Sequence, residues 1–260
     1  MRIEERLRES AVRHGPHPVV IAGRACHSYA ELDLKSERLG AELVGHGVGA
    51  GDRVLLFLDD GWEAVVSAFA IFKAGAVLVP VAAAATATVL LERVQATQPV
   101  AVVTQSRLGE MAAAAIAPVH SVKLAVLCGG DRNRAGGTCI SFEAAVERIR
   151  RTPPLPLVGS DTDAAVLIDG EPTLSHRQLL QDADADESDG RALPPLAERA
   201  GFVRLLAAVR AGHAMVAPLS FARIAIGGRI NEGASPAMAP RRLAGLLDGV
   251  AAGAAPAFQR

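Results

Sequence analysis

Hydrophobic positions in the first 127 residues of this chain follow two alternating patterns. Four continuous apolar runs, typical of strands buried on both faces of a parallel sheet, lie at 54–58, 76–80, 100–104 and 124–127. Four segments with apolar positions at helical spacing lie at 29–46, 63–74, 87–96 and 108–115. A helix over 1–14 and short strands at 19–22 and 26–28 come first. The alternation predicts an α/β fold with a mostly parallel sheet flanked by helices.

The pattern weakens after residue 127. We expect further helices at 141–151, 174–182 and 202–211, and short strands at 164–168 and 214–217. Residues 129–137 and 152–161 are predicted loops, and 241–247 is a helical candidate within a stretch rich in Gly, Ala and Pro. We therefore predict a domain over 1–218 and a tail over 219–260.

One apolar stretch, 65–87, is long enough to cross a bilayer, with Lys73 as its only charge. Gly75 and Pro80 interrupt it, and a charge at mid-span costs about 3 kcal/mol. We interpret the stretch as a buried helix followed by a buried strand, with no membrane span.

Composition and charge exclude several classes of function. The formal net charge is −1, which argues against a polybasic nucleic-acid binder. Aromatic residues make up 3% of the 260 residues, too few for a base-stacking platform. The three cysteines form no CxxC pair, so no structural zinc site is expected. The charged N-terminus has no apolar signal region, which favours a cytoplasmic protein.

The segment 28–80 carries motifs that occur together in one enzyme family. Residues 28–32 read SYAEL, a glycine-rich turn occupies 47–52, and residues 72–80 read FKAGAVLVP. In order and spacing they resemble the opening of the adenylate-forming superfamily, with clear similarity over 18–104. That family includes acyl-CoA synthetases, aryl-acid ligases, peptide-synthetase adenylation domains and luciferases. The resemblance implies the N-terminal half of that family's large α/β domain.

The resemblance continues with a gap at the family's phosphate loop. The family has a strand, a Ser/Thr/Gly-rich loop ending in Pro-Lys-Gly, and a Ser-His pair opening a helix. Here 164–168 resembles the strand and Ser175-His176 the pair, but only DGEPT, 169–173, lies between. Backbone amides exposed by glycines and a cation hold a triphosphate, and Asp169 and Glu171 would repel it.

Other family features are also missing. Glu198 stands where a histidine commonly follows an apolar run, and no lysine follows Lys123. The later aromatic-Gly-x-Thr-Glu motif, the ribose-binding aspartate and the mobile C-terminal subdomain with its catalytic lysine have no counterpart. We therefore expect no catalytic, cofactor-binding or metal-ligating residue in this chain.

Several other residues invite a functional interpretation that a structural one outweighs. The glycines between 45 and 51 follow a helix and precede a strand, which predicts a helix stop and not a dinucleotide loop. Ser175 and His176 are adjacent, so they predict a helix cap and its neighbour, not a catalytic pair. His14 and His17 lack further metal ligands nearby. Cys128 is interpreted as a partly buried structural thiol.

These observations predict a degenerate, truncated ligase homologue without adenylation activity. It would need no cofactor and would bind an acyl-type ligand, a carrier protein or a full-length ligase, or itself as a homodimer. The alternative is an active or partner-dependent AMP-forming acid:CoA or acid:carrier-protein ligase, for which ATP and Mg²⁺ would be required.

Two structural expectations accompany this interpretation. Lys73 should lie at a helix end with its stem on apolar surface and its ammonium in water. An apolar face that includes Leu205, Leu206, Val209, Met215 and Val216 should be left uncovered, favouring an interface with a second copy or a partner.

Overall fold

The computed structural model describes residues 1–129, 139–148, 155, 159–188 and 191–218. The helices are α1 (Ile3–His14), α2 (Tyr29–Gly45), α3 (Trp62–Lys73), α4 (Ala87–Thr97), α5 (Gly109–Ile116), α6 (Phe142–Glu147), α7 (His176–Ala185) and α8 (Arg199–Ala211), with a 3-10 turn η1 (Ser106–Leu108). The strands are β1 (Pro18–Ala22), β2 (Ala25–Ser28), β3 (Arg53–Leu58), β4 (Val77–Ala82), β5 (Ala101–Gln105), β6 (Leu124–Cys128), β7 (Cys139–Ser141), β8 (Ala164–Val166), β9 (Leu174–Ser175) and β10 (Met215–Val216).

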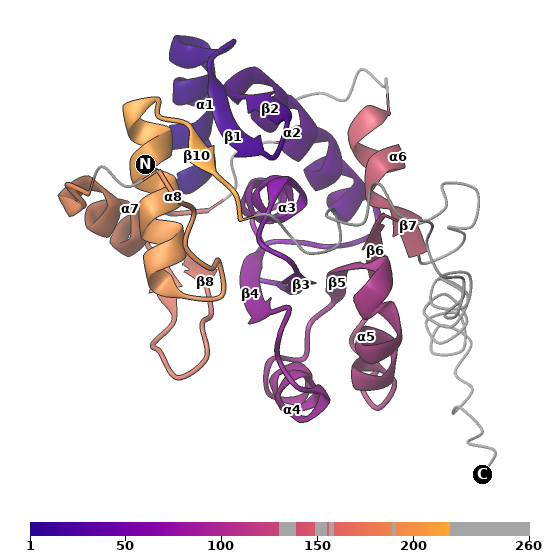
Figure 1. Cartoon of the computed structure of the whole chain (residues 1–260). Helices are drawn as coiled ribbons and strands as arrows, with labels where there is room; N and C mark the ends of the chain where they lie inside the picture. Colours follow the sequence, from indigo (N-terminus) through magenta and orange to yellow (C-terminus); the bar gives the residue numbers. More distant parts are fainter. Residues whose placement is uncertain (130–138, 149–154, 156–158, 189–190, 219–260) are drawn as a thin grey trace.

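Seven strands form the main sheet in the order β7-β6-β5-β3-β4-β8-β9 (Figure 1). All neighbours are parallel except β8 and β9, which form an antiparallel hairpin. A smaller sheet, β10-β1-β2, lies beside it. The predicted fold class, α/β with a mostly parallel sheet flanked by helices, is confirmed.

Side chains alternate between the two faces of the main sheet, as the period of a strand requires. In β3, Leu56 and Leu58 pack in the core shared by α2, α3 and α8, whereas Leu55 and Phe57 pack against α4 and α5. Both cores are apolar, which explains why the strands read as continuous hydrophobic runs.

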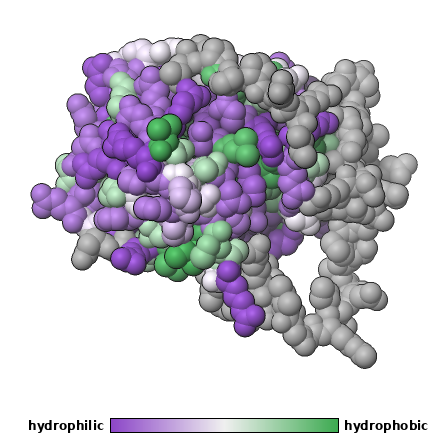
Figure 2. Space-filling view, turned by 90° about the horizontal axis from the view of Figure 1, so that it is seen from above, coloured by the Kyte–Doolittle hydropathy of each residue, from purple (hydrophilic) through white to green (hydrophobic). Residues whose placement is uncertain are grey.

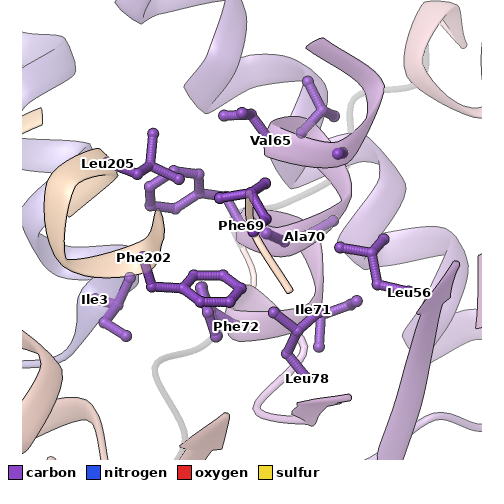
Figure 3. Close-up of a cluster of buried hydrophobic side chains, with 14 of the residues drawn as sticks. Ile3, Leu56, Val65, Phe69, Ala70, Ile71, Phe72, Leu78, Phe202 and Leu205 are labelled. Atoms are coloured by element: carbon purple, nitrogen blue, oxygen red, sulfur yellow. The ribbon is translucent and has the colours of Figure 1, made fainter. Parts of the chain in front are cut away.

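Helix α3 is the centre of the larger core (Figure 3). Its Phe72 meets Phe202 of α8 edge-on, with ring centroids 6.4 Å apart, and Ile3 of α1 lies beside them. Within the apolar stretch at 65–87, the predicted helix and strand are buried, whereas 82–87 lie at the surface. No helix among the described residues has the length and apolar character to span a bilayer.

The predicted elements agree with the structure, apart from shifts of a few residues at their ends. Ser28, Ser141 and Ser175 each cap a helix by accepting a hydrogen bond from a backbone amide of its first turn. Two short strands, β7 and β9, were not predicted; β9 covers Leu174–Ser175, where a helix was expected to begin. The predicted tail 219–260, with its candidate helix, nearly all of the loop 129–137, the last three residues of the helix predicted at 141–151 and residues 152–154 and 156–158 of the loop predicted at 152–161 lie outside the described residues.

The expectation of an uncovered apolar face near α8 is wrong. Leu205, Leu206, Val209 and Met215 are buried, and only Val216 is substantially exposed, at 46%. Helices α1 and α7 pack on α8 and cover it. The described surface seen in Figure 2 is mostly hydrophilic, with scattered apolar positions.

Opposite charges join α7 to α8. Arg199 of α8 pairs with Asp182 of α7 at 2.6 Å, and Arg210 lies 3.4 Å from Asp184. These ion pairs connect the two helices.

Candidate functional site

The β8–β9 hairpin stands where the family resemblance places a phosphate loop. Seven residues, 167–173, connect the two strands, and 169–173 are all exposed. The amide of Glu171 donates to the carbonyl of Ile168 at 3.4 Å, and Gly170 takes φ +70°. Such a tight turn needs a glycine for its left-handed position, and it leaves no open row of amides for a triphosphate.

Arg93 of α4 contacts this hairpin. Its guanidinium donates to the carbonyl of Leu167 and lies 3.3 Å from Asp169 Oδ1. The side chain is 10% exposed, and burial lowers its pKa, while Asp169 opposes that shift. The positive charge is therefore engaged in holding the hairpin.

Helix α7 begins immediately after the hairpin with a capping box. Ser175 accepts from the amide of Gln178 at 3.2 Å, and Gln178 Oε1 accepts from the amide of Ser175 at 2.9 Å. The side chain of His176 points into the core, where it is 0% exposed, whereas Ser175 lies on the side of the helix that faces solvent. The prediction of a helix cap and its neighbour is confirmed.

His176 belongs to a buried polar cluster with the start of α1. The amide of Ile3 donates to His176 Nδ1 at 3.3 Å, and Glu4 Oε2 lies 3.6 Å from the same nitrogen. Arg2 donates to Glu4 Oε1 at 2.5 Å and to the carbonyl of Ser160 at 2.9 Å. Burial lowers the pKa of His176 to about 3 and raises that of Glu4. The histidine is therefore neutral and serves as an acceptor that ties α1 to α7.

A cavity of about 300 Å³ opens at the carboxyl ends of β3, β5 and β6. The chain places β4 on one side of β3 and β5 on the other, so the order of winding reverses between β3 and β5. Ligands of open α/β sheets bind outside the strand ends at such a switch point, and the volume lies at the lower end of small-molecule sites. We call this space the carboxyl-edge cavity.

Carboxylates dominate the charges that line the carboxyl-edge cavity. Asp59 accepts from Gln105 Nε2 at 2.9 Å and pairs with Arg107, so its charge is compensated. Asp60 Oδ1 accepts from the amide of Leu196 at 2.8 Å, and burial raises the pKa of Asp60. Glu63, at the start of α3, also lines the cavity.

The rest of the wall is small or apolar. Trp62 lies against the ring of His27 at a centroid distance of 4.0 Å, which fixes the indole in place. Cys128 is buried, and burial raises its pKa well above the usual range. The thiol is thus un-ionised at neutral pH, and the structural interpretation of Cys128 is confirmed.

Lys73 is held differently from the prediction. Its side chain is 1% exposed, and the ammonium lies 2.7 Å from Asp33 Oδ1 and 3.1 Å from Glu37 Oε2. It also donates to the carbonyl of Asp33 at 2.7 Å. Because α2 packs across the end of α3, the ammonium meets two carboxylates of α2 before it can reach water. The prediction that the ammonium of Lys73 reaches water is therefore wrong.

The remaining candidate residues have structural positions. Helix α2 ends at Gly45, and Gly47 and Gly51 take positive φ in the turn before β3, which confirms a helix stop. Glu198 is the N-cap of α8 and makes no capping hydrogen bond with its side chain. Within the described residues, no three His, Cys, Asp or Glu side chains are grouped as metal ligands would be.

The chain is an α/β protein with a cavity at the carboxyl edge of its main sheet. The model of the family of AMP-binding enzymes matches residues 7–225, and this chain belongs to that family.

Sequence relatives are similar over a limited part of the chain. The salicyl-AMP ligase/salicyl-S-ArCP synthetase of Mycobacterium tuberculosis is 41% identical over 73 residues, which cover 26% of this chain and 13% of the relative. A medium/long-chain-fatty-acid–CoA/3-oxocholest-4-en-26-oate–CoA ligase of Mycobacterium marinum is 40% identical over 76 residues, 29% of this chain and 14% of the relative.

Solved structures of similar fold cover much more of the chain. Coronafacic acid ligase from Pectobacterium brasiliense has a TM-score of 0.74 at 16% identity over 86% of this chain. The A domain of a carboxylic acid reductase from Segniliparus rugosus has a TM-score of 0.73 at 17% identity over 85%. The aligned part is 46% and 45% of those two chains, so this chain spans less than half of either.

The residues of the carboxyl-edge cavity were missed by reasoning from the sequence. Asp59 and Asp60 follow one buried apolar run, and Gln105 to Arg107 follow another. The rule that ligands bind at strand ends would have pointed to them. It could not be applied without knowing that β3 and β5 are neighbours.

Proposed function

We propose that this chain binds an acyl-type ligand without activating it with ATP. The β8–β9 hairpin is the observation that carries the proposal. Its turn is closed by its own backbone, bears Asp169 and Glu171, and engages the charge of Arg93. Each lost charge-assisted phosphate contact weakens binding by about 1.5–3 kcal/mol, and several would be lost together.

The carboxyl-edge cavity supports binding of a small molecule and favours an uncharged one. A free carboxylate would lie near the carboxylate of Asp60, and the one cation among the described lining residues, Arg107, is already paired with Asp59. A neutral acyl derivative such as an ester, thioester or amide avoids that repulsion and can lie against Trp62. The ligand class proposed is therefore the neutral acyl group.

The alternative is an AMP-forming acid ligase that uses ATP and Mg²⁺. The activities named for the relatives, salicyl-AMP formation and fatty-acid–CoA ligation, favour it. An ATP–pyrophosphate exchange assay with a panel of carboxylic acids separates the two. We expect no exchange above the acid-free background and no micromolar affinity for Mg·ATP by isothermal titration, with the M. tuberculosis ligase and salicylate as the positive control. Acid-dependent exchange would establish the ligase alternative.

Ligand charge is tested separately with a carboxylic acid and the amide of the same carbon skeleton. We expect the amide to bind more tightly, and Asp60→Asn to narrow the difference by removing one carboxylate. Glu110→Gln, an exposed change on α5, is the charge-matched control. Equal binding of acid and amide by the unaltered protein would contradict the neutral-ligand proposal.

A further inference from the structure

A second concavity, of about 210 Å³, lies between α8 and the segment that follows α7. Three alanines on one face of α8, Ala207, Ala208 and Ala211, form part of its lining, and Met215 of β10 adds an apolar wall. Because these positions share one helix face and their side chains are small, they leave room for a ligand above α8. We call this second concavity the arginine concavity, because three arginines line it.

Three arginines, Arg191, Arg204 and Arg210, line this space. Arg210 donates to the carbonyl of Asp184 at 3.0 Å and pairs with its carboxylate at 3.4 Å, but the side chains of Arg191 and Arg204 have no hydrogen-bond or ion-pair partner among the described residues. Nearly all other described arginine side chains are engaged; Arg199, on the same helix, pairs with Asp182 at 2.6 Å. Two unengaged guanidiniums in one concavity are therefore unusual for this molecule.

Two carboxylates share the lining and limit the positive charge. Asp186 accepts from the amide of Ser188 at 3.1 Å, and the hydrogen bond to Ser188, together with nearby Arg204 and Arg210, lowers the pKa of Asp186. It forms no direct ion pair with either arginine within the described structure. Glu187 is exposed, as is His213 at the rim. Arg210 is itself paired with Asp184 at 3.4 Å, so Arg191 and Arg204 supply most of the positive charge available to a ligand.

We propose that the arginine concavity binds a phosphate monoester that carries a small organic group. Guanidinium groups donate in a planar fork that matches phosphate oxygens. A monoester presents three peripheral oxygens, enough for forks that come from three chain positions, whereas a carboxylate presents two. The alanine face of α8 and Met215 can accept the carbon part of the ester. The site is separate from the carboxyl-edge cavity and does not depend on the function proposed there.

Isothermal titration with phenyl phosphate, inorganic phosphate and benzoate, at one ionic strength, tests this proposal. We expect saturable binding of phenyl phosphate, weaker binding of inorganic phosphate, which lacks the ring, and the weakest binding of benzoate. Arg204→Gln and Arg191→Gln should each weaken phenyl phosphate binding at least tenfold. Neither side chain has a partner within the described part of the chain, so both variants should keep the melting temperature. Arg13→Gln on α1, where Arg13 pairs with Glu9, is the charge-matched control and should change nothing.

Other results would overturn the proposal. No saturable phenyl phosphate binding, equal binding of benzoate, or full binding by Arg204→Gln would each do so. If inorganic phosphate bound as tightly as phenyl phosphate, the proposal that the site also accepts an organic group would be wrong. Mg·ATP binding that is lost in Arg204→Gln would take place in this concavity. Mg·ATP binding that persists in Arg204→Gln would contradict the proposal that the hairpin holds no nucleotide.

Discussion

Charged groups are buried and paired in the middle of the main sheet, whereas at its β8–β9 edge they lie in solvent. Around β3, β4 and α3 the buried charge of Lys73 is matched by two carboxylates at short distance. At the β8–β9 turn the charges of Asp169 and Glu171 lie in solvent, and Asp169 is 82% exposed. Apolar packing continues through Val166, Ile168 and Leu174, but stops where the turn begins.

This difference separates the residues that hold the fold from those that would hold a nucleotide. Residues 169–173 contribute to neither hydrophobic core. The packing of β8 against β4 does not involve this connection. If the proposed function holds, a nucleotide site can therefore be lost there without reducing the stability of the α/β fold.

The largest effect should come from Lys73, in the middle of the molecule. Lys73→Met should lower the free energy of unfolding by about 3–5 kcal/mol, because Asp33 and Glu37 would be left near each other without their shared cation. The measurement is denaturant unfolding. Lys123→Met, an exposed lysine with no side-chain partner among the described residues, is the matched control and should change stability by about 0.5 kcal/mol or less. Similarly small changes in the free energy of unfolding of both variants would show that the buried ion pairs of Lys73 do not stabilise the fold.

A smaller, pH-dependent effect is expected from His176, at the edge. Its pKa of about 3 in the folded protein lies below the ordinary value of 6.5. The unfolded chain therefore takes up a proton that the folded one excludes, and stability falls as pH drops from about 6.5 toward 3. At pH 5 the loss is about 2 kcal/mol. The raised pKa of Glu4 acts in the opposite direction at acid pH, so the comparison must be made between variants.

His176→Asn keeps a polar acceptor near Ile3 but cannot titrate. We expect it to be less stable at pH 7 and to lose less stability between pH 7 and pH 5 than the unaltered protein, as measured by urea unfolding. His120→Asn, at an exposed position, should retain the original pH dependence. An unchanged slope in His176→Asn would mean that the buried histidine does not set the acid sensitivity.

The sequence predicted the sheet middle well because hydrophobic burial there is complete and periodic. The runs at 54–58 and 100–104, for example, appear as β3 and β5 with ends shifted by one residue. Polar contacts between distant segments were not accessible in the same way. The pairing of Lys73 with Asp33 depends on how α2 crosses α3, and the contact of Arg93 with Leu167 joins residues 74 positions apart.

Features of the candidate site also differ in whether the sequence alone could predict them. The short connection at 169–173 could be recognised from spacing alone, since it lies between two segments that resemble the family. The carboxyl-edge cavity and the arginine concavity require strand order and helix packing. Local periodicity specifies neither, because a lining residue such as Arg191 or Gln105 carries no pattern of its own.

The smallest effect should come from Arg93, which tests how firmly the hairpin is held. Arg93→Ala removes a charge-assisted hydrogen bond to the carbonyl of Leu167 and a pair with the exposed Asp169. An exposed ion pair contributes little, so most of the expected loss of about 1–2 kcal/mol comes from the carbonyl contact. Asp169→Asn, which removes only the exposed charge, should change stability by less than about 0.5 kcal/mol. Native-state hydrogen exchange provides the local measurement: amides of 167–174 should exchange faster in Arg93→Ala, while those of β3 and β5 should change much less. Equal effects of the two substitutions would show that the hairpin depends on its charge pair and not on the contact with its backbone.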